Sequence, residues 1–318
     1  MNTNLSNIEF RDAFIDELFS LAQSDRNIIF ISNEYGAPSL DRFREDLKDQ
    51  FINAGISEQN LISVAAGLAL SGKRVYVYSI ASFITLRCYE QIKIDICSMC
   101  LPVTIIGVGT GYAYSVDGPT HHATEDISIM RALAHMHIYS PADSNSAARL
   151  VDISLQSSMP LYFRFDKGKY PLLYEKNKDL SAGFSVLHKG KDLSIIATGS
   201  MVHNAVEIAS ELEKYSIKTQ VIDIFRLKPV NAHELIECVR PTKRIITIEE
   251  HTIHGGLGSI MAEILADAHI CIPLQRFAIK DEGLYAYGIR ENLLRECGLD
   301  KESIIQELLA WNEERAYI

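Results

Sequence analysis

Two hydrophobic patterns alternate along the first half of the chain. Short runs rich in Ile, Val, Tyr and Phe predict buried strands, and longer segments with apolar residues at helical spacing predict amphipathic helices. Because strands and helices alternate, parallel sheet with helical crossovers is favoured, and the predicted fold class is α/β. The expected strands are 27–32, 74–79, 103–108, 137–140 and 161–165. The expected helices are 8–23, 57–70, 84–100, 124–134 and 144–157.

The same alternation starts again after a polar stretch with turn residues, YEKNKDLSAG at 174–183. We therefore predict two domains, residues 1–178 and 179–318. The expected strands of the second domain are 193–197, 219–224, 244–249 and 274–279. Its expected helices are 201–214, 231–239 and 256–267, followed by two near the C-terminus.

Composition narrows the class of protein. The 318 residues are 47% hydrophobic, which is typical of a globular chain, and carry a formal net charge of −10. The sequence has no long basic run, which argues against binding to nucleic acid or to anionic membranes. Its apolar runs are strand-sized or interrupted by polar residues, so we expect no membrane span. The N-terminus lacks a basic segment followed by an apolar core, so we expect no secretory signal and a cytoplasmic location.

Two short motifs raise the question of a metal or redox site. Cys97 and Cys100 form a CxxC, CSMC, but it lies in a predicted helix and has no second ligand pair. The six cysteines are scattered, as expected for a reduced protein. His251 and His254, in HTIH, are spaced like a metal pair on a helix, but the following GGLGS indicates a loop. We interpret both motifs as structural.

Two further segments hold candidate chemistry. In FINAGISEQN (51–60), Ser57 is expected to cap a helix whose first turn contains Glu58, where the helix dipole favours a negative charge. In GVGTGYAYSVDGPTHHATED (107–126), a GxGxG is followed by a loop rather than a helix, which argues against a dinucleotide site. A long loop after a strand is typical of an active site, and this one carries Asp117, His121 and His122. Taken alone, a stabilising acid and a polar surface loop are the simpler explanations.

Together these segments resemble the pyrimidine-binding domain of the transketolase family of thiamine-diphosphate enzymes. The resemblance rests on GISEQN, AAGLALSGKRVYVYSIASFITLRCYEQIKIDI, LPVTIIGVGTG, DGPTHHATEDISIMRAL and SPAD, in that order within residues 8–172. IEEHTIHGGLGSIMAEIL and the later DEGL…GIRENLLRECGL are similar to the family's C-terminal domain. The resemblance implies two three-layer α/β/α domains with mostly parallel sheets.

The resemblance also implies which residues bind the cofactor. Glu58 corresponds to the catalytic acid that hydrogen-bonds the aminopyrimidine ring of thiamine diphosphate and favours the tautomer that activates the cofactor. Phe83 stands where the family stacks an aromatic side chain on that ring. Ile80 stands where some members carry another aromatic residue, so we expect an aliphatic wall there.

Substrate contacts are implied in the same way. His121 and Asp117, from DGPTH, match residues that contact sugar hydroxyls near the reacting carbons, and His121 is also expected to move protons. Arg11 and Lys167 match positions that contact the sugar phosphate. Lys167 stands where the family has an Arg; the lysine keeps the positive charge but cannot form the bidentate hydrogen bonds of a guanidinium. Because Gly109 replaces a His that contacts the phosphate in many members, we expect an altered phosphate site.

The resemblance finally implies a partner. The family holds Mg²⁺ and the diphosphate with a Gly-Asp-Gly sequence in a separate N-terminal domain, and no GDG occurs in this sequence. We therefore expect the Mg²⁺ ligands on an N-terminal transketolase-like diphosphate-binding subunit and no metal ligand in this chain. The expected assembly is an α₂β₂ heterotetramer in which this chain forms a homodimer.

The expected activity is transfer of a two-carbon ketol unit from a ketose, phosphorylated or nucleotide-linked, to an aldose. Three alternatives remain open. They are an acyloin condensation like that of deoxyxylulose-phosphate synthase, the β subunit of a 2-oxo acid dehydrogenase E1, and a non-catalytic partner subunit. The DGPTH segment and its histidines favour the sugar enzymes over the dehydrogenase.

Overall fold

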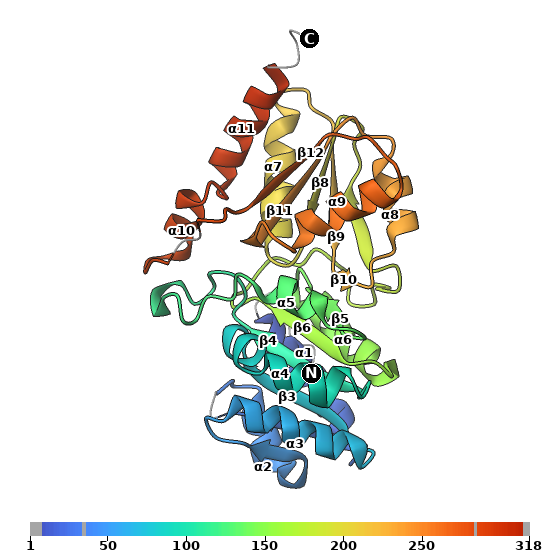
Figure 1. Cartoon of the computed structure of the whole chain (residues 1–318), viewed down its shortest axis with the longest axis vertical. Coiled ribbons are helices and arrows are strands. Elements are labelled where there is room, and N and C mark those ends of the chain that lie inside the picture. The colour runs from blue at the N-terminus through green and yellow to red at the C-terminus, as the bar shows by residue number, and fades with distance from the viewer. Residues whose placement is uncertain (1–7, 34–35, 283–284, 314–318) are drawn as a thin grey trace.

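Two sheets, one built mainly from each half of the chain, lie one above the other along the long axis of the molecule (Figure 1). The computed structural model describes residues 8–33, 36–282 and 285–313. The first sheet has the strand order β10-β5-β6-β4-β3-β1-β2 and the second has the order β12-β11-β8-β9-β7. Among the described residues, only the β10–β5 and β7–β9 pairs are antiparallel. The predicted α/β class with mostly parallel sheets is confirmed.

The first half supplies every strand of the first sheet except β10. Its strands are β1 (Ile28–Ser32), β2 (Phe51–Asn53), β3 (Arg74–Ile80), β4 (Val103–Val108), β5 (His137–Tyr139) and β6 (Leu161–Phe165). Its helices and helical turns are α1 (Phe10–Ala22), α2 (Leu40–Asp46), η2 (Lys48–Gln50), α3 (Glu58–Leu70), η3 (Phe83–Arg87), α4 (Tyr89–Gln91), η4 (Ile92–Cys97), η5 (Ser115–Asp117), α5 (Asp126–Ala132) and α6 (Ser144–Gln156).

The second half supplies β10 and the whole second sheet. Its strands are β7 (Phe184–His188), β8 (Leu193–Ala197), β9 (Thr219–Ile224), β10 (Arg226–Lys228), β11 (Ile245–Thr252) and β12 (Leu274–Ile279). Its helices are α7 (Met201–Glu213), α8 (Ala232–Val239), α9 (Leu257–Asp267), α10 (Arg290–Glu296) and α11 (Lys301–Glu313). Within the described ranges, none of the helices has the length and apolar character needed to cross a membrane.

Helices cover both faces of the first sheet, because its strands are apolar on both faces. Along β3, Tyr76 and Tyr78 point to the face covered by α1 and α6, whereas Val75 and Val77 point to the face covered by α3 and α5. In the second sheet, α7, α10 and α11 pack on one face and α8 and α9 on the other. The apolar core beneath α3 continues into the second half beneath α8 and α9, so the two halves share buried apolar surface.

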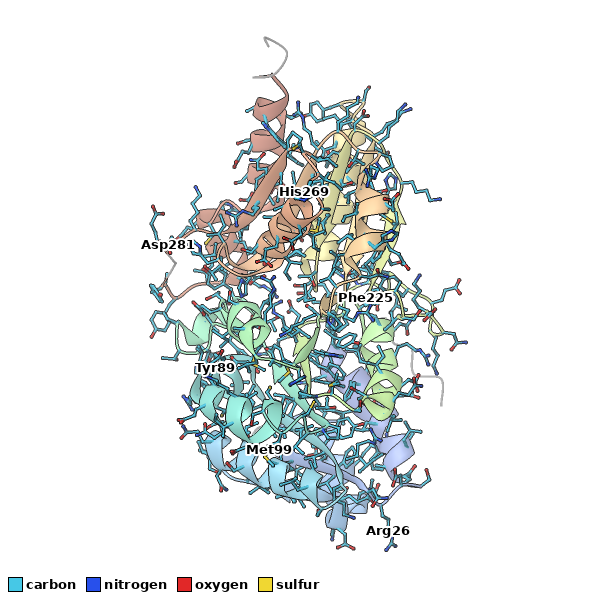
Figure 2. The ribbon with its side chains drawn as sticks, turned by 45° about the vertical axis from the view of Figure 1, so that its right-hand side comes forward. Arg26, Tyr89, Met99, Phe225, His269 and Asp281 are labelled. Atoms are coloured by element: carbon cyan, nitrogen blue, oxygen red, sulfur yellow. The ribbon has the colours of Figure 1, made fainter. Side chains whose placement is uncertain are left out.

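Several elements differ from the sequence-based expectation, which did not include α2, β2, β7 or β10. The single helix expected at 84–100 is wrong, because two π-helical segments, η3 and η4, flank the short α4. Such wide turns are frequent at functional sites. The three-residue strand β10 was not predicted at all. It crosses over from the second half and pairs with β5, beside Phe225, which is buried at the junction seen in Figure 2.

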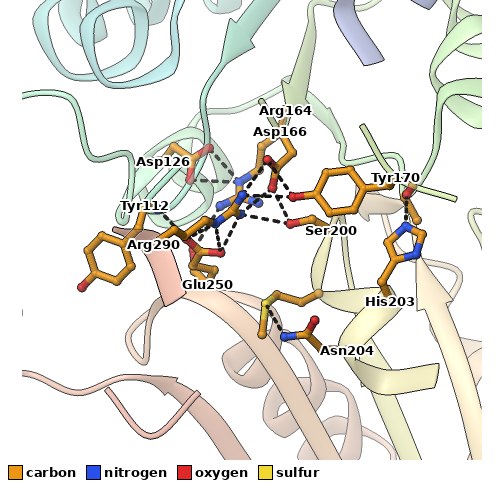
Figure 3. A network of polar contacts seen from close by, with 12 residues as sticks. Tyr112, Asp126, Arg164, Asp166, Tyr170, Ser200, His203, Asn204, Glu250 and Arg290 are labelled. Atoms are coloured by element: carbon orange, nitrogen blue, oxygen red, sulfur yellow. Dashed lines mark hydrogen bonds and ion pairs between the residues drawn. The ribbon is translucent and has the colours of Figure 1, made fainter. Parts of the chain in front are cut away.

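An ionic network also joins the two halves (Figure 3). The Arg290 guanidinium on α10 bonds Asp166, just after β6, at 2.6 and 2.8 Å, and Glu250, on β11, at 2.7 to 3.1 Å. It also donates to the Tyr170 and Ser200 hydroxyls. Burial alone would raise the pKa of Asp166, but the Arg290 charge and its hydrogen bonds outweigh burial and lower that pKa. The network therefore ties the end of the first sheet to the second sheet.

Candidate active site

The candidate site lies where three neighbouring strands of the first sheet end. β3, β4 and β6 are adjacent and parallel, and Ile80, Val108 and Phe165 pair with one another at their carboxyl ends. The carboxyl edge of a parallel sheet is the usual place for a ligand. Phe83 and Lys167 follow two of these strand ends directly, so the fold brings together segments that are distant in the sequence.

Glu58 is the first residue of α3, and its carboxylate is buried, with 8% of the residue exposed. Ser57 occupies the N-cap position, but the expected side-chain cap is wrong. Its hydroxyl donates to the Ala54 carbonyl at 2.6 Å instead of bonding the helix amides. Glu58 therefore sits at the positive end of α3 without a capping hydroxyl beside it.

Arg87 links Glu58 to Phe83. Its Nη1 lies 3.5 Å from Glu58 Oε2, and its Cζ lies 4.0 Å from the centroid of the Phe83 ring. The π-helical turn η3 carries both Phe83 and Arg87, so one local distortion places the ring and the cation together. Ile80, the last residue of β3, is fully buried three residues before Phe83. Glu58 and Phe83 thus both lie next to the Arg87 guanidinium.

The loop after β4 places His121 against Phe83. Their ring centroids are 4.9 Å apart, and His121 Nδ1 lies 3.0 Å from the Thr120 hydroxyl. Asp117 ends the turn η5 and is exposed on the same loop, with its backbone N–H bonded to the Tyr114 carbonyl. His122 has a different environment, since it is buried against the Tyr112 ring and burial lowers its pKa. We interpret His122 as a neutral structural residue.

Tyr114 is a residue that the sequence analysis missed. Its ring lies 5.9 Å from the His121 ring, and Lys167 Nζ lies 4.3 Å from its centroid. Phe83, His121, Tyr114 and Lys167 therefore form a continuous row from the expected cofactor ring to the expected phosphate ligand. A tyrosine in a glycine-rich loop carries no local signal for this contact, because the contact depends on how β4 and β6 are paired.

Arg11 lies apart from this row. It is on α1, and its guanidinium bonds the Tyr78 hydroxyl at 3.2 Å and the Glu9 carboxylate at 2.9 Å. Tyr78 points to the sheet face that α1 and α6 cover, whereas Glu58 begins a helix on the other face. A role for Arg11 in binding substrate stays a prediction.

Neither short motif forms a metal site in the described part of the chain. His251 is buried at the end of β11, and burial lowers its pKa to about 4. His254 is exposed and lies 3.2 Å from Asp281. All six cysteines are free, and burial raises the pKa of Cys97 to about 11. No cluster of three or more His, Cys, Asp or Glu side chains suited to a metal occurs among the described residues.

Comparisons with known proteins identify the family. The family model for the transketolase pyrimidine-binding domain matches residues 6–172, and the model for the transketolase C-terminal domain matches residues 183–304. A subunit of an apulose-4-phosphate transketolase from Phocaeicola vulgatus is 35% identical over 95% of this chain and 97% of its own length. A 6-deoxy-6-sulfo-D-fructose transketolase subunit from Clostridium sp. strain MSTE9 is 30% identical over 93% of this chain and 92% of its own length.

Among solved structures, one described as a split gene transketolase, inactive β4 tetramer, superimposes with a TM-score of 0.86. It is 32% identical, and the match covers 94% of this chain and 96% of that chain. Family models, relatives of similar length and a solved structure therefore agree. The chain belongs to the transketolase family of thiamine-diphosphate enzymes, of which it contains the pyrimidine-binding and C-terminal domains.

Proposed function

We propose that this chain is the C-terminal subunit of a split transketolase. Together with a separate diphosphate-binding subunit, it transfers a two-carbon ketol unit from a ketose to an aldose. The observation that carries the proposal is a row of contacts at the carboxyl edge of the first sheet, which runs from Glu58 through Arg87, Phe83, His121 and Tyr114 to Lys167. The apulose-4-phosphate transketolase relative has nearly the same length and is named as one subunit of its enzyme, which supports a division of the enzyme into separate chains.

Glu58 and Phe83 fit the aminopyrimidine of thiamine diphosphate. When bound, the cofactor supplies the nucleophilic carbon for cleavage of the bond next to the donor ketone. Glu58 would hydrogen-bond a ring nitrogen from a buried carboxyl group, where water competes little. Phe83 would hold the ring plane, and Ile80 is proposed as the aliphatic wall beside it. Both Glu58 and Phe83 contact Arg87 in this structure, so those contacts would be released as the ring enters.

The remaining residues would hold the substrate. His121 and Asp117 would bond sugar hydroxyls near the reacting carbons, and His121 would also move a proton there. Lys167 would attract an anionic group at the far end of the sugar, and Arg11 is proposed for the same group. Holding donor and acceptor in fixed geometry is the main contribution that these side chains can make to the rate.

The assembly is also a proposal. We assign Mg²⁺ and the diphosphate to an N-terminal transketolase-like subunit, and propose an α₂β₂ heterotetramer built on a homodimer of this chain. The inactive β4 assembly described for the solved split transketolase supports the idea that such a chain associates with itself and needs its partner for activity. The proposed domains are 1–178 and 179–318, and the proposed location is the cytoplasm.

Substitution of Glu58 in the complete complex tests the function. We expect Glu58→Ala to reduce ketol transfer on the order of 100-fold or more, because cofactor activation loses its acid. Glu58→Gln keeps the size of the side chain, and Glu45→Gln, on the exposed side of α2, is the matched control. Assembly is checked by size-exclusion chromatography. Full activity of Glu58→Ala in an intact complex would mean that this site is not used and would favour the non-catalytic alternative.

A further inference from the structure

The ring of Tyr114 fills a space that exists because residue 109 is glycine. Gly109 follows β4 with a φ of +84°, a conformation that favours glycine. A Cβ atom placed on Gly109 would lie 2.0 Å from Tyr114 Cε2 and 2.2 Å from Cδ2. Any side chain at position 109 would therefore displace the ring.

Tyr114 is held firmly in this position. Only 5% of the residue is exposed. Its carbonyl accepts a hydrogen bond from Asp117 N–H at 3.0 Å, and the preceding residue, Ala113, donates its N–H to the Thr110 carbonyl at 3.1 Å. An aromatic side chain has two rotatable bonds and loses little freedom when it packs. The ring thus has a fixed position next to both His121 and Lys167.

We propose that Tyr114 is a specificity-determining residue that limits the length of the ketose. This inference rests on the proposed function. His121 marks the reacting end of the substrate, and the Lys167 ammonium, held over the Tyr114 ring, marks the anionic end. Because the ring occupies the space beside Gly109, the site takes a short ketose whose anionic group reaches Lys167 directly. A longer polyol chain would have to occupy the space beside Gly109 that the Tyr114 ring fills.

A panel of donors tests the proposal in the complete complex. The donors are ketose phosphates of increasing chain length, and the readout is the ratio of kcat/KM for the longest donor to that for the shortest. We expect Tyr114→Ala to raise this ratio about tenfold or more, since removal of a side chain from a pocket changes discrimination by that amount. Tyr114→Phe keeps the ring and should keep the wild-type ratio. Tyr215→Ala, an exposed tyrosine in the second half, controls for loss of a tyrosine.

A double substitution distinguishes displacement of the Tyr114 ring from a general disturbance of the backbone at position 109. Gly109→Ala in the wild-type background should push the ring aside and change the ratio. In the Tyr114→Ala background the same substitution should leave the ratio unchanged, because no ring remains to be displaced. The backbone strain at position 109 is present in both backgrounds and therefore cancels.

The outcomes distinguish this inference from the proposed function. An unchanged length ratio in Tyr114→Ala, in a complex that transfers ketol units, would overturn the inference and leave the function standing. Absence of ketol transfer by the wild-type complex with every donor would overturn both. If Tyr114→Ala does not assemble with its partner, Tyr114→Leu, which keeps an apolar side chain but removes the ring, supplies the same test with the same two outcomes.

Discussion

Arg87 Nη1 lies 3.5 Å from Glu58 Oε2 while the same guanidinium lies over the Phe83 ring. One cation therefore contacts both residues that are proposed to hold the cofactor ring. The ion pair is weak because half of the Arg87 side chain is exposed, and the contact with the ring adds a modest attraction. Little free energy is therefore needed for the cofactor ring to displace Arg87 from Glu58 and Phe83.

Removal of Arg87 is predicted to strengthen cofactor binding. Arg87→Ala should lower the Kd of thiamine diphosphate for the complete complex by up to about tenfold, because no contacts have to be broken first. Arg87→Lys keeps a cation, so its Kd for thiamine diphosphate should be closer to that of the wild type. Calorimetric titration measures both. Weaker binding by Arg87→Ala would show that Arg87 itself contacts the cofactor.

Lys167 is predicted to act on the charge of the substrate. Lys167→Ala should raise KM for a ketose phosphate on the order of 10- to 100-fold, since a hydrogen bond to a charged group is lost. KM for the same ketose without phosphate should change little. Lys167→Arg should restore binding, and Lys176→Ala, at an exposed position, is the control. Equal effects on both substrates would contradict a phosphate-binding role.

Arg290 is predicted to stabilise the junction of the two halves. Arg290→Met leaves Asp166 and Glu250 buried without their cation, which should lower the free energy of unfolding by about 3–5 kcal/mol. Arg295→Met, on the exposed side of the same helix, should change it little. Urea unfolding of the full chain measures the difference. A loss below about 1 kcal/mol would mean that the network contributes little to stability.

Asp223 is predicted to make stability depend on pH. It is fully buried on β9 and accepts a hydrogen bond from the Tyr174 hydroxyl at 2.6 Å. Burial raises its pKa to about 8, and the nearby Asp143 charge adds to the rise. Because the pKa in the folded chain exceeds that in the unfolded chain, its contribution is complete below about pH 4 and is lost as pH rises through about 8.

The isosteric variant Asp223→Asn isolates this effect. Between about pH 5 and pH 8, the free energy of unfolding of the wild type should fall relative to that of Asp223→Asn by up to about 1.4 kcal/mol per pH unit. Urea unfolding at several pH values measures both curves, and the other titrating groups are common to the two proteins. Parallel curves would show that Asp223 is ionised in the folded chain.

Much of the fold follows from local pattern. The central strands β3, β4, β6, β8 and β9 are rich in apolar residues and buried along almost their whole length, as expected for strands covered on both faces. The strands β2, β7 and β10 and the helix α2 were not predicted, and β10 depends on its pairing with β5 of the other half. The break in the helix expected at 84–100 arises from π-helical turns that hydrophobic spacing does not reveal.

The candidate site residues were predicted from resemblance to a family rather than from local hydrophobic pattern. Glu58, Phe83 and His121 were named as site residues because together they resemble a family, whereas each alone had a simpler structural explanation. The contacts of Tyr114 and Arg87 were not found, since they depend on side chains packed across strand ends and on a π-helical turn. Arg11 was also named from the resemblance, and its role stays a prediction; in this structure it bonds Tyr78, on the sheet face that α1 and α6 cover.

The central claim is that this chain provides half of a thiamine-diphosphate site. The most direct test is a calorimetric titration of thiamine diphosphate with Mg²⁺ into the chain alone, and then into the chain mixed with the diphosphate-binding subunit encoded nearest to it. The account predicts heat of binding only for the mixture. Tight binding by the chain alone would contradict the divided site, and no binding in either sample would contradict its role as a half of such an enzyme with that partner.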